Sequence, residues 1–139
     1  RNPPTSVNDQ PSAVDRNTGT PTTNQMSRAP NRKNRAADSA FTRGWNAGTV
    51  LRIPVAHHDG NYTIDADGLA RLRGENRVAF RYLVNPNGAT DDIAGVLSVN
   101  RRVLGLMPHP ERAADARLGL TDGAVMFRSL TDTLAPAGV

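Results

Sequence analysis

The residues best suited to chemistry lie in the segment 108–111, where a histidine stands between two prolines. His109 follows the apolar run 104–107, and Glu111 comes two residues later. The prolines restrict the backbone on both sides of His109, which lowers the entropy cost of holding the imidazole in one orientation. If Glu111 accepts a hydrogen bond from one ring nitrogen, the other nitrogen can take a proton from a nucleophile. The segment therefore fits a general base at His109, although the residue types alone favour a proline-rich turn with a surface histidine.

A second cluster of reactive side chains follows the apolar stretch 50–56. It consists of His57, His58 and Asp59, followed by Gly60 and Tyr62. Histidine and aspartate are common metal ligands. Adjacent side chains in an extended chain point to opposite faces, however, so His57 and His58 are poorly placed to share one ion, and we expect no metal site. Gly60 allows either close approach of the backbone to a ligand or a tight turn.

Hydrophobic periodicity and turn residues predict the elements that carry these two clusters. We expect strands over 50–57, 77–84, 93–99 and 102–107, and helices over 65–75 and 122–134. Pro54 indicates that the first strand lies at a sheet edge or ends early. The short connection at Asn100 and Arg101 predicts a hairpin. Asp65 or Asp67 is expected to cap the first helix, and Thr121 the second.

The order of these elements favours one part of a layered α/β sheet over a self-sufficient fold. In open α/β sheets, functional residues lie in loops beyond the carboxyl ends of strands. Both the segment 57–60 and the segment 108–111 follow predicted strands, so the fold class supports both as candidate sites.

The first 37 residues differ in composition from the rest of the chain. They contain no Leu, Ile, Phe, Trp or Tyr, and are rich in Pro, Asn, Thr, Ser and Arg. Such a segment cannot bury enough apolar surface to offset the entropy cost of ordering, so we expect 1–37 to be disordered and 38–139 to be folded. The basic cluster 32–35 also fits a nucleic-acid-binding tail on a small α/β domain. Because no aromatic residue lies nearby to stack on a base, we favour a solvated tail and expect no nucleic-acid partner.

Two absences in the sequence limit the chemistry of the chain and the compartment in which it works. The 139 residues include no cysteine, so they contain no disulfide and no cysteine nucleophile. No apolar run is long enough to span a membrane, and the first residues do not resemble a signal peptide. We therefore expect a cytoplasmic protein that does not bind a membrane.

Five motifs, in this order, resemble those of a known enzyme family. They are IPVAHHDGNY, RVAFRY, NPNGATDDIAGVLS, RVLGLMPHPER and TDGAVMFRSL. Together they resemble the carboxyl-terminal half of the glutamine amidotransferase (glutaminase) subunits of phosphoribosylformylglycinamidine synthase. The resemblance extends from about residue 37 to residue 134. It implies part of a class I glutamine amidotransferase domain, which has a flavodoxin-like α/β fold.

The resemblance also implies a reaction and a set of partners. Members of this family release ammonia from glutamine with a Cys-His-Glu triad and pass it to a synthetase subunit in de novo purine biosynthesis. That subunit uses ATP and Mg, and a small accessory subunit completes the complex. On this basis His109 is the general base and Glu111 orients it. His57, Gly60 and Tyr62 belong to a substrate or interface loop, and the chain itself binds no cofactor.

The sequence departs from the family pattern in two places. The family's nucleophilic cysteine is absent, so we expect this chain alone to be inactive as a glutaminase. An alternative is a non-catalytic binding subunit, or a remnant, that docks on the synthetase. Residues 1–37 are expected to lie outside the family sequence, with a composition like that of a frameshifted segment. In addition, His58 and Asp59 stand where the family usually has Gly and Glu.

Overall fold

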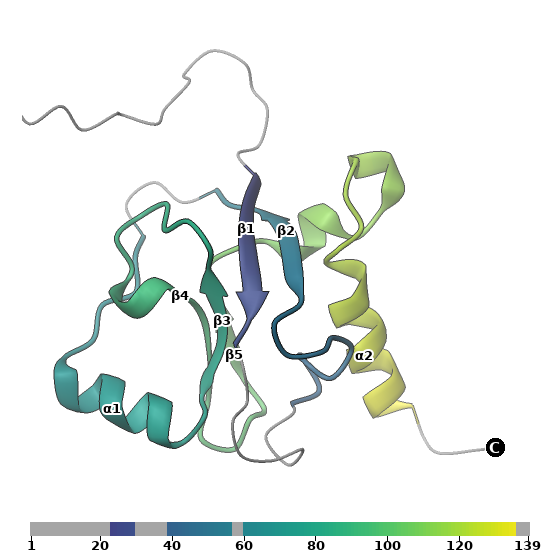
Figure 1. Ribbon diagram of the computed structural model, residues 1–139. Helices are drawn as coiled ribbons and strands as arrows, with labels where there is room; N and C mark the ends of the chain where they lie inside the picture. Colours follow the sequence, from purple (N-terminus) through teal and green to yellow (C-terminus); the bar gives the residue numbers. More distant parts are fainter. Residues whose placement is uncertain (1–22, 30–38, 57–59, 136–139) are drawn as a thin grey trace, which may run out of the picture.

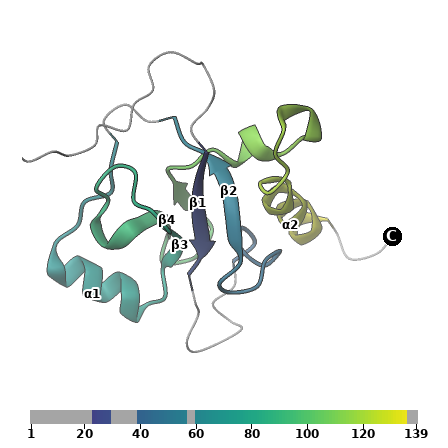
Figure 2. The same ribbon diagram turned by 45° about the horizontal axis from the view of Figure 1, so that its top comes forward.

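The residues that the structure describes form a central five-stranded sheet, and every neighbouring pair of its strands is antiparallel. The computed structural model describes residues 23–29, 39–56 and 60–135 (Figure 1). The strand order is β2-β1-β3-β4-β5, with bounds Val50–Pro54, Thr23–Arg28, Val78–Tyr82, Ile93–Leu97 and Leu104–Leu106. The helices α1 (Ala66–Gly74) and α2 (Ala124–Leu134) lie on either side of the strands in both ribbon views (Figure 2).

Strand β1 corrects part of the prediction for the first 37 residues. Thr23–Arg28 pairs with β2 on one side and with β3 on the other. The prediction of disorder is therefore wrong for these six residues, while 1–22 and 30–37 lie outside the described residues. The composition does not indicate this strand because Met26 is its only large apolar side chain. That side chain is completely buried. Backbone hydrogen bonds on both edges supply the remaining order.

The other predicted elements are confirmed, with shorter ends. Strand β2 ends at Pro54 and forms an edge of the sheet, as the proline indicated. Strands β4 and β5 form the predicted hairpin, in which Val96 lies opposite Gly105. Helix α1 is capped by Asp65, whose carboxylate accepts a hydrogen bond from the Gly68 N–H at 2.7 Å.

Helix α2 begins two residues later than predicted and ends at Leu134, as predicted. It begins at Ala124, and the Thr121 side chain does not cap it. The apolar periodicity of this helix also predicts a buried stripe of Val125, Met126, Leu130 and Leu134. Leu134 is instead 79% exposed, because the last turn of the helix extends past the core. Met126 is buried, and Val125 and Leu130 pack against the core as expected.

The core lies between the sheet and the segments packed on it, including α2. Ile53, Phe80 and Met26 are completely buried. The Trp45 ring meets the Phe80 ring edge to face, with centroids 5.8 Å apart. This arrangement is favourable for aromatic pairs. It brings the segment before β2 onto the middle of the sheet.

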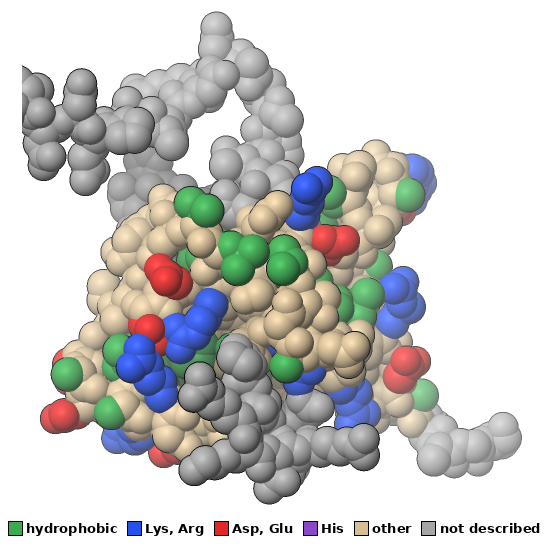
Figure 3. Space-filling model, viewed as in Figure 1, with side chains coloured by type: hydrophobic (Ala, Val, Ile, Leu, Met, Phe, Trp, Pro, Cys, Tyr) green, Lys and Arg blue, Asp and Glu red, His purple; other side chains and the backbone are tan. Residues whose placement is uncertain are grey.

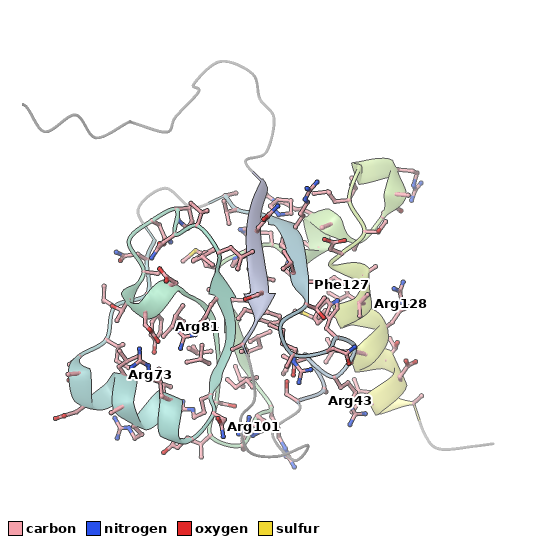
Figure 4. All side chains as sticks on the ribbon, in the orientation of Figure 1. Arg43, Arg73, Arg81, Arg101, Phe127 and Arg128 are labelled. Carbon is pink, nitrogen blue, oxygen red and sulfur yellow. The ribbon has the colours of Figure 1, made fainter. Side chains whose placement is uncertain are left out.

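An ion-pair cluster joins α1 to the turn before β4. Arg73 of α1 and Arg81 of β3 each approach the Asp91 carboxylate to 2.5 Å, and Figure 4 labels both arginines. Basic and acidic side chains lie next to each other on this side of the molecule (Figure 3). Asp91 has a φ of 56°, in the left-handed region that non-glycine residues rarely adopt. The two arginines therefore hold a strained turn in place.

The burial of Met26 makes a test of strand β1 possible. Replacing Met26 by Ala should lower the free energy of unfolding by about 2–5 kcal/mol, because it empties a fully packed position. The neighbouring Gln25 side chain is exposed, so Gln25→Ala should change the free energy by about 0.5 kcal/mol or less. Urea unfolding measures both values. Equal effects of the two substitutions would show that β1 is not a packed central strand.

The Asp91 cluster predicts a particular dependence of stability on pH. The hydrogen bond from Arg73 is the main cause that lowers the pKa of Asp91 below its ordinary value of 3.8, against a smaller opposing effect of burial. A lowered pKa in the folded state stabilises the protein above pH 3.8 and loses that effect as pH falls further. Asp91→Asn should therefore lower the Tm by roughly 3 °C at neutral pH and have less effect at pH 3. A Tm difference that does not change with pH would contradict this assignment.

Candidate active site

His109 and Glu111 meet in the structure as the sequence predicts. The Nδ1 atom of His109 lies 2.8 Å from Oε1 of Glu111. An ionised carboxylate can only accept a hydrogen bond, so this geometry places a proton on Nδ1. The Nε2 atom forms no hydrogen bond with the described residues, and the His109 side chain is 35% exposed. Nε2 is therefore available to a reacting group.

The turn that carries the pair is fixed to the end of another strand. The short 3-10 helix η3 (Pro110–Ala113) follows β5 after three residues. The backbone N–H of His109 donates to the carbonyl of Pro54, at the end of β2, over 2.8 Å. Pro54 itself is fully buried. The backbone at His109 is therefore fixed by a residue of another strand, Pro54, at the point where β2 ends.

The Glu111 carboxyl group has a lowered pKa, which favours the ionised form that can orient an imidazole. Partial burial pushes the pKa of Glu111 upward, but the bond from its own backbone N–H, the bond with His109 and the attraction of His109 and Arg112 together outweigh this. The pKa of Glu111 therefore lies below its ordinary value of 4.5. An ionised carboxylate next to Nδ1 also stabilises the imidazolium that forms when Nε2 takes a proton.

The second predicted cluster is only partly described. His57, His58 and Asp59 lie outside the described residues. The carbonyl of Gly60 accepts a hydrogen bond from the side chain of Asn87 at 2.6 Å. Tyr62 is half-buried against the core, and its carbonyl accepts a bond from the Thr90 N–H at 2.8 Å. The segment 60–62 is therefore held by the turn before β4.

The residues Asn85, Pro86, Asn87 and Gly88 predict a turn at this point, but the prediction does not include the turn's internal bonding. The Asn85 side-chain oxygen accepts bonds from the backbone N–H groups of Asn87, Gly88 and Ala89. Its amide donates to the Ala89 carbonyl and to Asp92. Asparagine at the start of a turn is the signal for such bonding. That signal does not reveal the contact between Asn87 and Gly60, which lie 27 residues apart.

A separate pocket lies next to α1. It has a volume of about 330 Å³ and is lined by Tyr62, Ile64, Gly68, Arg71, Leu72, Glu75, Arg77 and Val99. Neither His109 nor Glu111 contributes to it. Within the described ranges, no three histidine, aspartate or glutamate side chains come together as a metal site. No helix in this part of the chain has the length and apolar character needed to cross a membrane.

Comparison with known proteins shows the family. The model of the CobB/CobQ-like glutamine amidotransferase domain matches residues 23–118, which include His109, Glu111 and strand β1. The chain therefore belongs to the family of CobB/CobQ-like glutamine amidotransferase domains. The match begins inside the segment 1–37, so the prediction that this whole segment lies outside the family is wrong for Thr23–Arg28.

Individual relatives agree with this assignment. The phosphoribosylformylglycinamidine synthase subunit PurQ of Cereibacter sphaeroides is 66% identical over 99 residues, which is 71% of this chain and 45% of that protein. The PurQ subunit of Ruegeria pomeroyi is 63% identical over 101 residues, or 73% of this chain and 46% of that protein. The chain thus spans a little under half the length of these curated relatives.

A solved structure confirms the predicted fold class. The structure of PurLQS from Thermotoga maritima matches 84% of this chain and 48% of the compared chain, with a TM-score of 0.67 and 34% identity. The described part of the chain therefore has the α/β fold of part of a glutamine amidotransferase domain.

The contact between His109 and Glu111 can be tested by titration. Replacing His109 by Ala removes both the hydrogen bond and the electrostatic attraction through which this residue lowers the pKa of Glu111. The pKa of Glu111 should rise toward its ordinary value, as measured from the carboxyl ¹³C shift. Arg112→Gln is the matched control, and it should raise the pKa less because Arg112 is the weakest influence. An unchanged Glu111 titration in His109→Ala would show that the two side chains do not meet in solution.

Proposed function

We propose that this chain supplies the base of a glutaminase site, in a component of phosphoribosylformylglycinamidine synthase that provides ammonia for de novo purine biosynthesis. The observation that carries the proposal is the His109–Glu111 pair, with its 2.8 Å hydrogen bond and its accessible Nε2. The match to the amidotransferase family and the identity with PurQ subunits support it.

The proposed chemistry assigns one task to each nitrogen of His109. Nε2 accepts the proton of a cysteine thiol, and the thiolate attacks the side-chain amide carbon of glutamine. His109 then returns the proton to the departing nitrogen, which leaves as ammonia. Water hydrolyses the remaining thioester to glutamate. Glu111 holds the proton on Nδ1 throughout and stabilises the positive imidazolium.

The thiol in this scheme has to come from outside the given sequence. None of the 139 residues is cysteine, and His109 and Glu111 cannot replace a thiolate. We therefore expect the chain alone to show no glutaminase activity at ordinary enzyme rates. The same absence supports the alternative of a non-catalytic subunit that keeps the docking surface.

The partners follow from the same proposal. Ammonia released at the site would pass to a synthetase subunit that uses ATP and Mg, with a small accessory subunit in the complex. The structural likeness to a chain of PurLQS from Thermotoga maritima supports such an assembly. We place His57, Gly60 and Tyr62 at the substrate or interface loop of this complex, and the complex in the cytoplasm.

A chimera with a full-length relative tests the proposal. Residues 23–118 of this chain, which the family model matches and which include His109 and Glu111, would replace the equivalent segment of the Cereibacter sphaeroides PurQ subunit. Release of glutamate from glutamine would be measured with the synthetase present. The chimera should be active. His109→Gln should reduce kcat roughly 10³-fold or more, and Glu111→Gln roughly 10²- to 10⁴-fold. Arg112→Gln, next to the pair, should stay within a few-fold of the unaltered chimera.

Two other results would refute the proposal. A folded chimera that hydrolyses glutamine equally well with Gln at position 109 would remove His109 from the reaction. A chimera that binds the synthetase but has no glutaminase activity would favour the binding-only alternative.

A further inference from the structure

The motif Thr121-Asp122-Gly123 lies directly against the turn that carries His109 and Glu111. A Cβ atom placed on Gly123 would lie 2.1 Å from the carbonyl oxygen of Pro110 and 2.8 Å from its carbonyl carbon. Real Cβ atoms do not approach backbone atoms so closely. Gly123 has an ordinary φ of −72°, so this position needs glycine for space and not for backbone conformation.

Hydrogen bonds join the same three segments into one junction. The N–H of Gly123 donates to the carbonyl of Ala113 over 2.8 Å, which connects the start of α2 to the end of η3. The Asp122 carboxylate accepts the N–H of Arg52 at 2.7 Å, which connects the start of α2 to β2. Two residues along β2, the Pro54 carbonyl accepts the N–H of His109. We call this arrangement of β2, η3 and the start of α2 the junction.

From this geometry we propose that Gly123 and Asp122 are positioning residues for the His109–Glu111 pair. The carbonyl that Gly123 approaches belongs to the peptide bond between Pro110 and Glu111, the link that sets where Glu111 lies relative to the imidazole. Any group larger than hydrogen at position 123 pushes on this peptide. Loss of the Asp122 bond frees the start of α2 from β2, so that Gly123 no longer holds the turn in one place against the sheet. The catalytic meaning of this positioning depends on the proposed function, but the geometry does not.

Measuring which ring nitrogen of His109 carries the proton distinguishes a residue that positions the pair from one that only stabilises the fold. Nδ1 of His109 lies 2.8 Å from the Glu111 carboxylate. Because an ionised carboxylate only accepts hydrogen bonds, this contact favours a proton on Nδ1 when the ring is neutral. Long-range ¹H–¹⁵N spectra of the full chain, recorded at about pH 9 where imidazoles are neutral, report which ring nitrogen carries the proton. A residue that only stabilises the fold would change the Tm without changing this spectrum.

The first variant is Gly123→Ala, and the matched control is Gly74→Ala. A Cβ on Gly74 meets no atom within 4 Å, so the control should keep the Nδ1-protonated ring. Gly123→Ala should shift the population toward the Nε2-protonated ring, to the extent seen when Glu111 is replaced by Ala. Amide spectra and circular dichroism establish that each variant is folded.

A second pair of variants tests the junction with less risk to folding. Arg52 is exposed, so water can replace the Asp122 carboxylate at its N–H and Asp122→Ala should fold. It should move the tautomer in the same direction as Gly123→Ala. Asp122→Asn keeps a side-chain oxygen that can accept the bond, and it should restore the spectrum of the unaltered chain.

The proposal is overturned if folded Gly123→Ala or Asp122→Ala keeps the original tautomer. It is also overturned if Asp122→Asn behaves like Asp122→Ala. The chimera assay is independent of these spectra. An inactive chimera with the expected tautomer changes would reject the proposed function and leave the positioning role in place.

Discussion

The close approach of two backbones, at Gly123 and Pro110, is the constraint on which the candidate site depends. It lets η3 lie directly on the start of α2, where the Gly123 N–H reaches the Ala113 carbonyl. With the bond from His109 to Pro54, the turn is fixed at both ends. Fixing a catalytic group before the substrate arrives removes an entropy cost that the reaction would otherwise include. The prolines beside His109 act in the same direction.

The sheet provides the frame for this junction through a strand that composition did not reveal. Strand β1 separates β2 from β3, so without it the Pro54 carbonyl would have no fixed place relative to β5 and the turn that follows. The packing of Met26, Phe80 and Trp45 keeps these strands together. The chemistry of the turn therefore depends on a segment that carries a single large apolar residue.

Sequence reasoning succeeded where the determinants are local and failed where they are distant. The two prolines and the spacing of two residues allow the pairing of His109 with Glu111, and the family resemblance favours it over a plain surface turn. The edge position of β2 follows from Pro54, and the cap on α1 from Asp65. By contrast, the need for glycine at position 123 arises from a turn thirteen residues away, and the bond from Asn87 spans 27 residues. Such contacts leave no periodic signal, because only the folded chain brings their atoms together.

Chemical rescue tests the proposed role of His109 as a base most directly. The measurement is glutamine hydrolysis by the chimera carrying His109→Gly, with and without added imidazole. This variant should be nearly inactive, and imidazole should restore activity in a saturable way by filling the space next to Glu111. Full activity of the folded His109→Gly chimera without imidazole would contradict this role.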